Sequence, residues 1–505
     1  MSRDGQDGPD LVVAGAGGGL AAALRAAELG LDVLVVETSE NFQRGNNTSM
    51  STAMVPGAGT RFQEAAGVDD SPELFLADIM AKTHGEADER LARALTQVSA
   101  RLVEWLVDAV GLDLDLVTDF HYPGHSVDRC HTLDGRHGTL LLDHLVRRVR
   151  DTGAVDLLAP ARLVDVRLDA TGRVEAAVLE RPDGGTEEVP TRAVLLATNG
   201  YGADRALVAE HLPEIADAVY HGSESSRGDA LRIGQGLGAQ VAYLDAYQGH
   251  GALAQRTSTL VDWATIMHGG IIVGSDGRRF GNETSGYSEY AAVIAAQPES
   301  AAWLLLDRRI HDACLVFTDF RQTVDGGALA WADDVAALAA ATHTPVLALA
   351  EELDTAAALA SGSVGGPDRF GRTDFEAPLE PPYAAVRVVP ALFHTQGGLV
   401  VDGHARVLRE DGTPVAGLYA SGGAAAGISG HGAAGYLAGN GLLPALGLAF
   451  LAAEDVAGVG EEPRPAGAEP SSRSDPQQAA RPTDPPTDRP TDRPTDHNPS
   501  VEVRA

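Results

Sequence analysis

The chain has 505 residues and a formal net charge of −33. That length is sufficient for two domains or more. The excess of acidic residues argues against a nucleic-acid surface and against an anionic-membrane surface, because both call for basic patches.

The cysteines and the apolar stretches limit the class of protein. Cys130 and Cys314 lie far apart and form no metal, haem or iron–sulfur motif. No basic and then apolar leader precedes Asp10, and the weakly polar stretch Leu437–Ala453 is too short and too interrupted to cross a bilayer. We therefore expect a cytoplasmic protein with free thiols, no metal and no integral membrane segment.

The stretch from Asp10 to Glu37 is predicted to bind a dinucleotide. An apolar run predicts a buried strand, a Gly-rich turn follows, and an Ala- and Leu-rich segment predicts a helix that Gly30 ends. A second strand, Val33–Val36, leads to Glu37, whose carboxylate can accept from both ribose hydroxyls of an adenosine. The turn glycines are Gly15, Gly17, Gly18 and Gly19.

The glycine spacing departs from the usual Gly-x-Gly-x-x-Gly. Leu20 stands where the last glycine is expected, and Gly19 comes one residue early, which we interpret as a loop shortened by one residue. The alternative is a βαβ unit with a Gly-rich turn and no ligand. The helix N-terminus would offer unpaired N–H groups to a pyrophosphate.

Polar loops and helices follow Glu37. Residues 38–63 are rich in Gly, Asn, Ser and Thr, as in a loop that wraps a phosphate, ribityl or isoalloxazine group, or one that only makes turns. A helical pattern covers about 71–110. Five histidines lie within 121–144 without metal-site spacing; among their neighbours, Arg129 and His131 are candidates to face a cofactor or substrate.

Residues 155–198 predict a β-meander that closes into a buried strand. The turn Asp183-Gly184-Gly185 favours a hairpin, and the strand Ala193–Ala197 runs directly into Thr198-Asn199-Gly200. Open α/β sheets bind ligands at the carboxyl ends of their parallel strands, so this turn is a second candidate for cofactor contact.

The fold class predicted is α/β, a Rossmann-like FAD-binding domain with an inserted α+β capping domain. The first part of the sheet domain covers residues 10–240, the capping or substrate domain 241–375, and the second part of the sheet domain 376–457. Residues 458–505 are rich in Pro, Asp and Arg and contain PTDPPTDRPTDRPTD, a composition that predicts a disordered tail.

Several motifs together resemble the flavoprotein family of fumarate reductase, succinate dehydrogenase and 3-ketosteroid Δ1-dehydrogenase. The resemblance runs from about residue 10 to about 457. Beside the glycine loop, it rests on LLATNGYG, SRGDALRIGQGLGA at 226–239, YQGHG at 247–251, DGRRFGNE at 276–283, HTQGG at 394–398 and GLYASGG at 417–423.

The resemblance implies an FAD that is bound noncovalently, because residues 38–60 contain no histidine of the kind that carries covalent FAD in some members. It also implies a last helix whose N-terminus points at the flavin and stabilises the reduced anion. The cofactor-binding residues expected are Gly15, Gly17, Gly18, Gly19, Glu37, Asn47, Thr48, Ser49, Thr198, Asn199, Gly200, Asp229, Gly422, Asn440, Gly441 and Leu442.

The same resemblance suggests four catalytic residues. Tyr287 stands where fumarate reductases carry a proton-donating arginine and ketosteroid dehydrogenases a tyrosine. His394 and His250 match substrate-binding histidines, and Tyr436 is a candidate to polarise a carbonyl. The segment His431–Tyr436, where a dicarboxylate-binding arginine is expected, contains no arginine, which favours a neutral carbonyl substrate.

The function predicted is an FAD-dependent oxidoreductase that forms or reduces a C–C double bond beside a carbonyl. Its partners would be a small-molecule substrate and an external electron donor or acceptor. The alternatives are a fumarate reductase-like enzyme acting on an unsaturated acid, a noncatalytic subunit that holds FAD, and an NAD-only Rossmann protein.

Overall fold

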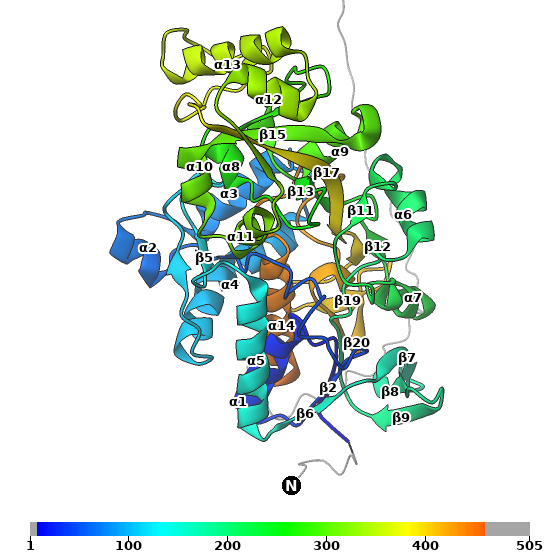
Figure 1. Ribbon diagram of the computed structural model, residues 1–505. Helices are drawn as coiled ribbons and strands as arrows, with labels where there is room; N and C mark the ends of the chain where they lie inside the picture. Colours follow the sequence, from blue (N-terminus) through cyan, green and yellow to red (C-terminus); the bar gives the residue numbers. More distant parts are fainter. Residues whose placement is uncertain (1–7, 460–505) are drawn as a thin grey trace, which may run out of the picture. The chain divides into compact units, whose positions relative to one another are not determined.

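The computed structural model describes residues 8–459, and Figure 1 shows the course of the chain. Most of the tail expected at 458–505 therefore lies outside the described residues. Within 8–459, no helix combines the length and the apolar character needed to span a bilayer.

A six-stranded sheet forms the base of the fold, in the order β19-β20-β10-β1-β2-β6. All neighbouring pairs are parallel except β19, which runs antiparallel to β20. The apolar runs predicted as buried strands are its central members, and the α/β prediction with a parallel sheet is confirmed. The strands are β1 Leu11–Ala14, β2 Val33–Val36, β6 Val155–Leu158, β10 Val194–Leu196, β19 Arg406–Leu408 and β20 Pro414–Ala420.

Helices from both ends of the chain pack together beside this sheet. Helix α1 (Gly19–Glu28) lies against α14 (Leu442–Val456), as Figure 1 shows in blue and orange. A Cβ atom placed on Gly18 would lie 2.8 Å from the Cβ and the carbonyl oxygen of Ala445. Glycine is therefore needed at position 18 for the two helices to approach.

The remaining elements of this region surround that pair. The predicted meander is a three-stranded antiparallel sheet, β7-β8-β9, with the Asp183-Gly184-Gly185 turn between its last two strands. A small sheet in the order β3-β5-β4 and a β12–β18 pair lie among the helices. The bounds are β3 Val55–Pro56, β4 Asp115–Leu116, β5 Cys130–Thr132, β7 Arg162–Leu168, β8 Val174–Glu180, β9 Thr186–Pro190, β12 Val241–Ala242, β18 Gly398–Leu399, α2 Arg61–Ala66, α3 Pro72–Lys82, α4 Glu89–Asp108, α5 Gly138–Thr152, α6 Arg205–His211 and α7 Asp229–Gly236.

A second sheet is built around the long strand β17 (Tyr383–Thr395), which pairs with β11, β13, β15 and β16, while β14 pairs with β15. β17 falls within the 376–457 segment expected in the sheet domain, yet its hydrogen bonds are to strands of the second sheet. The other bounds are β11 Val219–Tyr220, β13 Tyr247–Ala254, β14 Ile271–Val273, β15 Ala302–Asp307, β16 Leu329–Ala332, α8 Ala264–Met267, α9 Glu289–Ala295, α10 Arg308–Cys314, α11 Thr318–Asp325, α12 Val335–Thr342 and α13 Val346–Ala360.

The contact at Gly18 is open to a direct test. Gly18 has a φ of −57°, so alanine meets no backbone strain there and its methyl group only crowds Ala445. We expect Gly18→Ala to lower the free energy of unfolding of the apoprotein by about 1–3 kcal/mol, the usual scale for overpacking. Urea unfolding of the protein freed of flavin would measure it.

The matched control is Gly236→Ala at the end of α7, where an added Cβ atom meets nothing within 4 Å. This variant should be as stable as the wild type or slightly more stable, because alanine favours the helix. Equal stability of the two variants would contradict the packing argument.

Candidate active site

One large cavity lies between the carboxyl ends of the parallel strands and the second sheet. It is lined from the ends of β1 and β2 and the turn after β10 on one side, and from β13, β17 and the segment before α8 on the other. Its empty volume, including the mouth open to solvent, is about 1790 Å³. The cavity runs from the Gly-rich turn after β1 to His250 and His394 on the second sheet, so both sheets contribute to one site.

The structure brings most of the predicted site residues to this cavity. All four predicted catalytic side chains line it, and so do thirteen of the sixteen predicted cofactor-binding residues. These thirteen are Gly15, Gly17, Gly18, Glu37, Asn47, Thr48, Thr198, Asn199, Asp229, Gly422, Asn440, Gly441 and Leu442.

The other three predicted residues lie behind the cavity wall. A Cβ atom on Gly19 would lie 2.7 Å from Val13, so this glycine lets α1 approach β1. The hydroxyl of Ser49 donates to the carbonyl oxygen of Asn46 at 2.8 Å. A Cβ atom on Gly200 would lie 1.9 Å from the hydroxyl of Thr395. Each of the three shapes the wall without lining it.

Glu37 holds the glycine loop at the nucleotide end of the cavity. Its Oε2 accepts from the backbone N–H of Ala16 at 2.9 Å, and its Oε1 accepts from Ser39 at 3.1 Å. Asp229, at the start of α7, is held by Arg162, whose Nε and Nη2 donate to it at 2.9 and 2.5 Å. Arg162 is the one Lys or Arg among the residues that line the cavity, and its charge is balanced there.

Three buried polar atoms on the cavity wall have no hydrogen-bond partner in the described part of the chain. They are Thr198 Oγ1 after β10, Ser421 Oγ after β20 and Asn440 Oδ1 before α14. A buried polar group left unpaired costs about 1–3 kcal/mol. Helix α14 also begins without a side-chain cap. Unpaired polar groups and a free helix N-terminus at the ends of adjacent parallel strands fit the polar edges of FAD.

The four predicted catalytic side chains form a cluster at the other end of the cavity. The rings of His250 and Tyr287 stack with centroids 5.1 Å apart, and Tyr436 meets Tyr287 edge-on at 5.8 Å. Tyr436 also lies edge-on to His394 at 6.0 Å. Because these side chains come from β13, β17 and two loops, only the tertiary fold brings them together.

Both histidines of this cluster are neutral at pH 7. Burial lowers the pKa of His250 to about 3 and that of His394 to about 4. The N–H of Ala252 donates to Nδ1 of His250 at 3.0 Å, which leaves the ring proton on Nε2. No residue among 8–459 bonds to that Nε2, so His250 offers a hydrogen-bond donor to the cavity.

A chain of side chains sets the tautomer of His394. Asn440 donates to Ser429 at 3.2 Å, Ser429 donates to Gln396 at 3.0 Å, and the Gln396 amide then faces Nδ1 of His394 at 3.1 Å. Nδ1 also lies 3.3 Å from the carbonyl oxygen of Thr395, but the amide group needs an acceptor. Nε2 of His394 therefore carries the proton.

The two tyrosines also keep their protons. Burial raises the pKa of Tyr287 well above its ordinary value, and burial does the same for Tyr436. The hydroxyl of Tyr436 accepts from the N–H of Gly441 at 3.1 Å, beside the start of α14. A Cβ atom on Gly441 would crowd His394 Nε2 at 3.0 Å, so glycine allows the backbone to reach both side chains.

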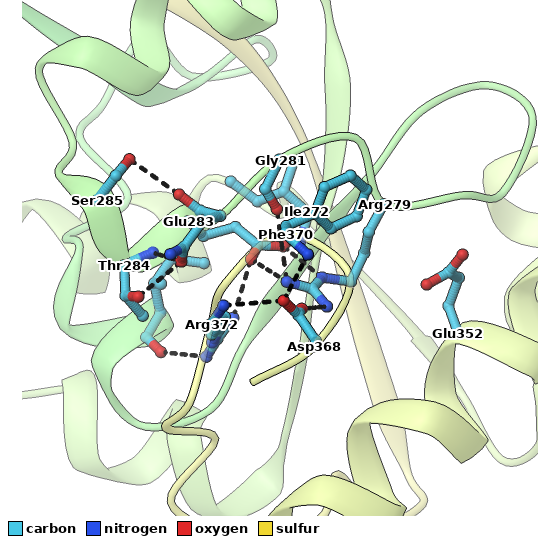
Figure 2. A network of polar contacts seen from close by, with 12 residues as sticks. Ile272, Arg279, Gly281, Glu283, Thr284, Ser285, Glu352, Asp368, Phe370 and Arg372 are labelled. Atoms are coloured by element: carbon cyan, nitrogen blue, oxygen red, sulfur yellow. Dashed lines mark hydrogen bonds and ion pairs between the residues drawn. The ribbon is translucent and has the colours of Figure 1, made fainter. Parts of the chain in front are cut away.

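A buried ion cluster fixes the segment that carries Tyr287. Arg279 donates to Glu283 at 2.8 and 2.5 Å and to Asp368 at 2.5 Å, and Arg372 donates to Glu283 at 3.2 Å. Figure 2 shows both arginines pointing toward the two carboxylates. The DGRRFGNE motif thus acts through this cluster, because Arg279 and Glu283 do not line the cavity.

Sequence reasoning missed several lining side chains, among them Tyr122, His221, Asp262, Trp263 and Phe393. They lie in segments without periodic pattern or family motif. Conversely, Arg129 and His131 do not line the cavity. Arg129 is buried in ion pairs with Asp70 and Asp78, because a buried guanidinium needs paired carboxylates.

The low pKa of His250 predicts sensitivity to acid. Because the folded pKa lies below the unfolded one, the unfolded state binds the proton first, and stability is lost as pH falls from about 6.5 toward 3. Between pH 7 and pH 5, the free energy of unfolding of the wild type should fall by about 2 kcal/mol more than that of His250→Asn.

Urea unfolding at several pH values would measure this difference. The control is His343→Asn, because His343 is exposed at the end of α12 with a φ of 55° that Asn tolerates. The free energy of unfolding of His343→Asn should change with pH as that of the wild type does. A pH dependence shared by His250→Asn and the wild type would refute the assignment of a neutral, buried His250.

Comparisons with known proteins identify the family of this chain. The family model described as "FAD binding domain" matches residues 10–442. An NADH:fumarate oxidoreductase of Klebsiella pneumoniae is 30% identical over 83% of this chain, which spans 45% of that protein. The open conformation of a flavocytochrome c3 fumarate reductase has a TM-score of 0.73 and 27% identity, covering 91% of this chain and 80% of the other.

A 3-ketosteroid-Δ4-(5α)-dehydrogenase from Rhodococcus jostii RHA1 has a TM-score of 0.69 and 25% identity, covering 90% of this chain and 98% of the other. The family match covers most of the described residues, including the glycine loop, Glu37 and the start of α14. The chain therefore belongs to the FAD-binding family of flavin-dependent oxidoreductases that includes the fumarate reductases and the 3-ketosteroid dehydrogenases.

Proposed function

We propose that this protein forms or reduces a C–C double bond next to a carbonyl group of an uncharged substrate. The observation that carries the proposal is the charge of the cavity. Its one arginine, Arg162, is paired with Asp229 at the nucleotide end, and the catalytic cluster consists of neutral histidines and tyrosines. A buried dicarboxylate would need paired positive charge.

The neutral side chains of the cluster suit a ketone. Nε2–H of His250 and of His394 and the hydroxyl of Tyr436 are hydrogen-bond donors at the cavity. Donors held in a buried site stabilise the negative charge that develops on a carbonyl oxygen as the neighbouring carbons react. The bound flavin would supply or take up the hydride at one of these carbons.

Tyr287 is proposed as the group that moves the proton at the neighbouring carbon. Burial raises its pKa, so the phenol holds its proton at neutral pH and is prepared to donate it. No Lys or Arg of the described residues lines the cavity near it to stabilise a phenolate. This protonation state favours reduction of a double bond, whereas dehydrogenation would require the phenolate first.

Several further features belong to the same proposal. The FAD would be noncovalent, because no histidine occurs in residues 38–60. Residues 241–375, which include most strands of the second sheet, would act as the capping domain over the flavin. Electrons would come from or pass to an external partner, since residues 8–459 contain no cluster of three or more His, Cys, Asp or Glu suited to a metal ion.

Two alternatives remain distinguishable. The relatives named as fumarate reductases suggest reduction of an unsaturated acid, which the lack of an unpaired cation disfavours. A noncatalytic subunit that only holds FAD would not need a cluster of buried donors at the end of the cavity farther from Glu37. Activity retained after replacement of Tyr287, His250 and His394 together would favour that second alternative.

Tyr287→Phe should leave FAD bound and slow flavin reduction or reoxidation by a substrate at least about 100-fold, because loss of a general acid or base usually costs that much. The matched control is Tyr290→Phe: its hydroxyl is buried, has no partner within residues 8–459 and does not line the cavity. Stopped-flow spectroscopy of the flavin would measure both. A rate near wild type for Tyr287→Phe would exclude it as the proton carrier.

The substrate class can be read from the flavin spectrum under anaerobic conditions. The photoreduced protein should be reoxidised by a cyclic enone and left unchanged by fumarate, since residues 8–459 place no unpaired Lys or Arg on the cavity wall to hold a dicarboxylate. A parallel sample of oxidised protein receives a saturated cyclic ketone, which would bleach it if dehydrogenation is the favoured direction. Rapid reoxidation by fumarate would overturn the proposal and support the first alternative.

A further inference from the structure

A carboxyl group that no family motif predicts lies at the substrate end of the cavity. Asp262 precedes α8, lines the cavity beside Trp263 and Tyr287, and is 6% exposed. Trp263 meets the ring of His250 edge-on at 5.6 Å, which places this segment next to the catalytic cluster. Asp262 is therefore within the part of the cavity that a substrate must occupy.

Only one oxygen of this carboxyl is satisfied by the protein. Oδ1 accepts from the N–H of Ala264 at 2.8 Å, whereas no residue among 8–459 donates to Oδ2. Oδ2 is not one of the enclosed polar atoms without a partner, so it is accessible from the cavity that Asp262 lines, and a donor bound there can pair with it. The free oxygen is thus available to a hydrogen-bond donor of the substrate.

The charges around Asp262 do not neutralise it. Among residues 8–459, Arg136 is the cation that favours ionisation of Asp262, and its Nη2 is bound to both carboxylate oxygens of Asp119 at 2.8 and 2.9 Å. Asp119 and Asp319 oppose ionisation of Asp262, and the other titratable groups that face it are the buried Tyr122, Tyr287 and Cys314. Burial raises the pKa of Asp262 to about 7.

We propose that Asp262 is a specificity residue that excludes substrates bearing a carboxylate near it and accepts a hydrogen bond from a hydroxyl or amino group at the same place. A side chain that attracts one class of substrate and repels another discriminates between the two more strongly than attraction alone. This inference rests on the proposed function, because it assigns the part of an uncharged carbonyl substrate that lies away from the reacting bond.

The test uses three cyclohex-2-enones that differ only at carbon 4, carrying hydroxymethyl, methyl or carboxylate. Their dissociation constants from the oxidised holoprotein are measured by perturbation of the flavin spectrum, at pH 8.5 and pH 5.5. We expect the hydroxymethyl compound to bind tightest, and the carboxylate at least about tenfold more weakly at pH 8.5 than at pH 5.5. Two like charges a few ångströms apart in a protein site repel by enough for this effect.

Asp262→Asn keeps the shape and an acceptor oxygen but removes the charge. It should bind the carboxylate at least about tenfold more tightly at pH 8.5, abolish the pH dependence of that binding, and change the affinity for the methyl compound little. The matched control is Asp307→Asn: Asp307 is also buried and accepts from a backbone N–H, but it does not line the cavity. Asp307→Asn should bind the three compounds with the affinities and the pH dependence of the wild type.

The outcomes distinguish a failure of the proposed role of Asp262 from a failure of the proposed function. If the three compounds bind alike to the wild type, or if Asp262→Asn leaves their ranking and pH dependence unchanged, the role of Asp262 is wrong while the proposed function stands. If none of the enones binds or reoxidises the reduced protein, the proposed function itself fails, and the inference falls with it.

Discussion

The close packing of the first helix against the last is the constraint on which the cavity depends. Gly18 and Ala445 leave no space for a further methyl group between α1 and α14. Arg25 on α1 also pairs with Glu454 on α14 at 2.8 Å. Because β1, β10 and β20 run parallel, the Gly-rich turns after β1 and β20 lie at one edge of the sheet, and the packing of α14 on α1 brings the start of α14 to the same wall.

Positive charge is distributed so that, among residues 8–459, no unpaired Lys or Arg lines the end of the cavity that holds the histidines and tyrosines. The chain has a net charge of −33, yet its buried arginines are paired away from the substrate end. Arg279 and Arg372 are bound by Glu283 and Asp368, and Arg129 by Asp70 and Asp78. Burial of each ion is costly, so loss of one partner would leave an uncompensated charge and would destabilise the fold. In this protein the buried ion pairs hold backbone segments in place, and none of these residues lines the cavity.

The parts of the fold that the sequence predicted are the local ones. The apolar runs at 11–14 and 33–36 became β1 and β2 at those residues, and the helix from Gly19 ends at Glu28. A strand, a turn and a helix can be recognised from sequence patterns within about thirty residues. Glu37 could be identified because it directly follows the second strand. Family motifs placed Tyr287, His250, His394 and Tyr436, whose proximity the structure then showed.

What the sequence could not predict depends on contacts between distant segments. β17 pairs with β13, β15 and β16, which no local pattern reveals, so the strand was expected in the other sheet. Asp262 reads as an ordinary loop aspartate until its burial and its place on the cavity wall are known. Arg129 shows the reverse case: its place among several histidines made it a candidate to face a cofactor or substrate, whereas its carboxylate partners lie 51 to 59 residues away in the chain.

The cofactor end and the substrate end of the cavity are joined by one chain of hydrogen bonds. Asn440 presents an unpaired Oδ1 at the start of α14, while its Nδ2 begins the series through Ser429 and Gln396 that ends at His394. The orientation of the Asn440 amide is therefore coupled to the position of the proton on His394. Asn440 is among the residues that would hold the FAD, so one side chain would serve both the cofactor and the histidine that donates to the substrate.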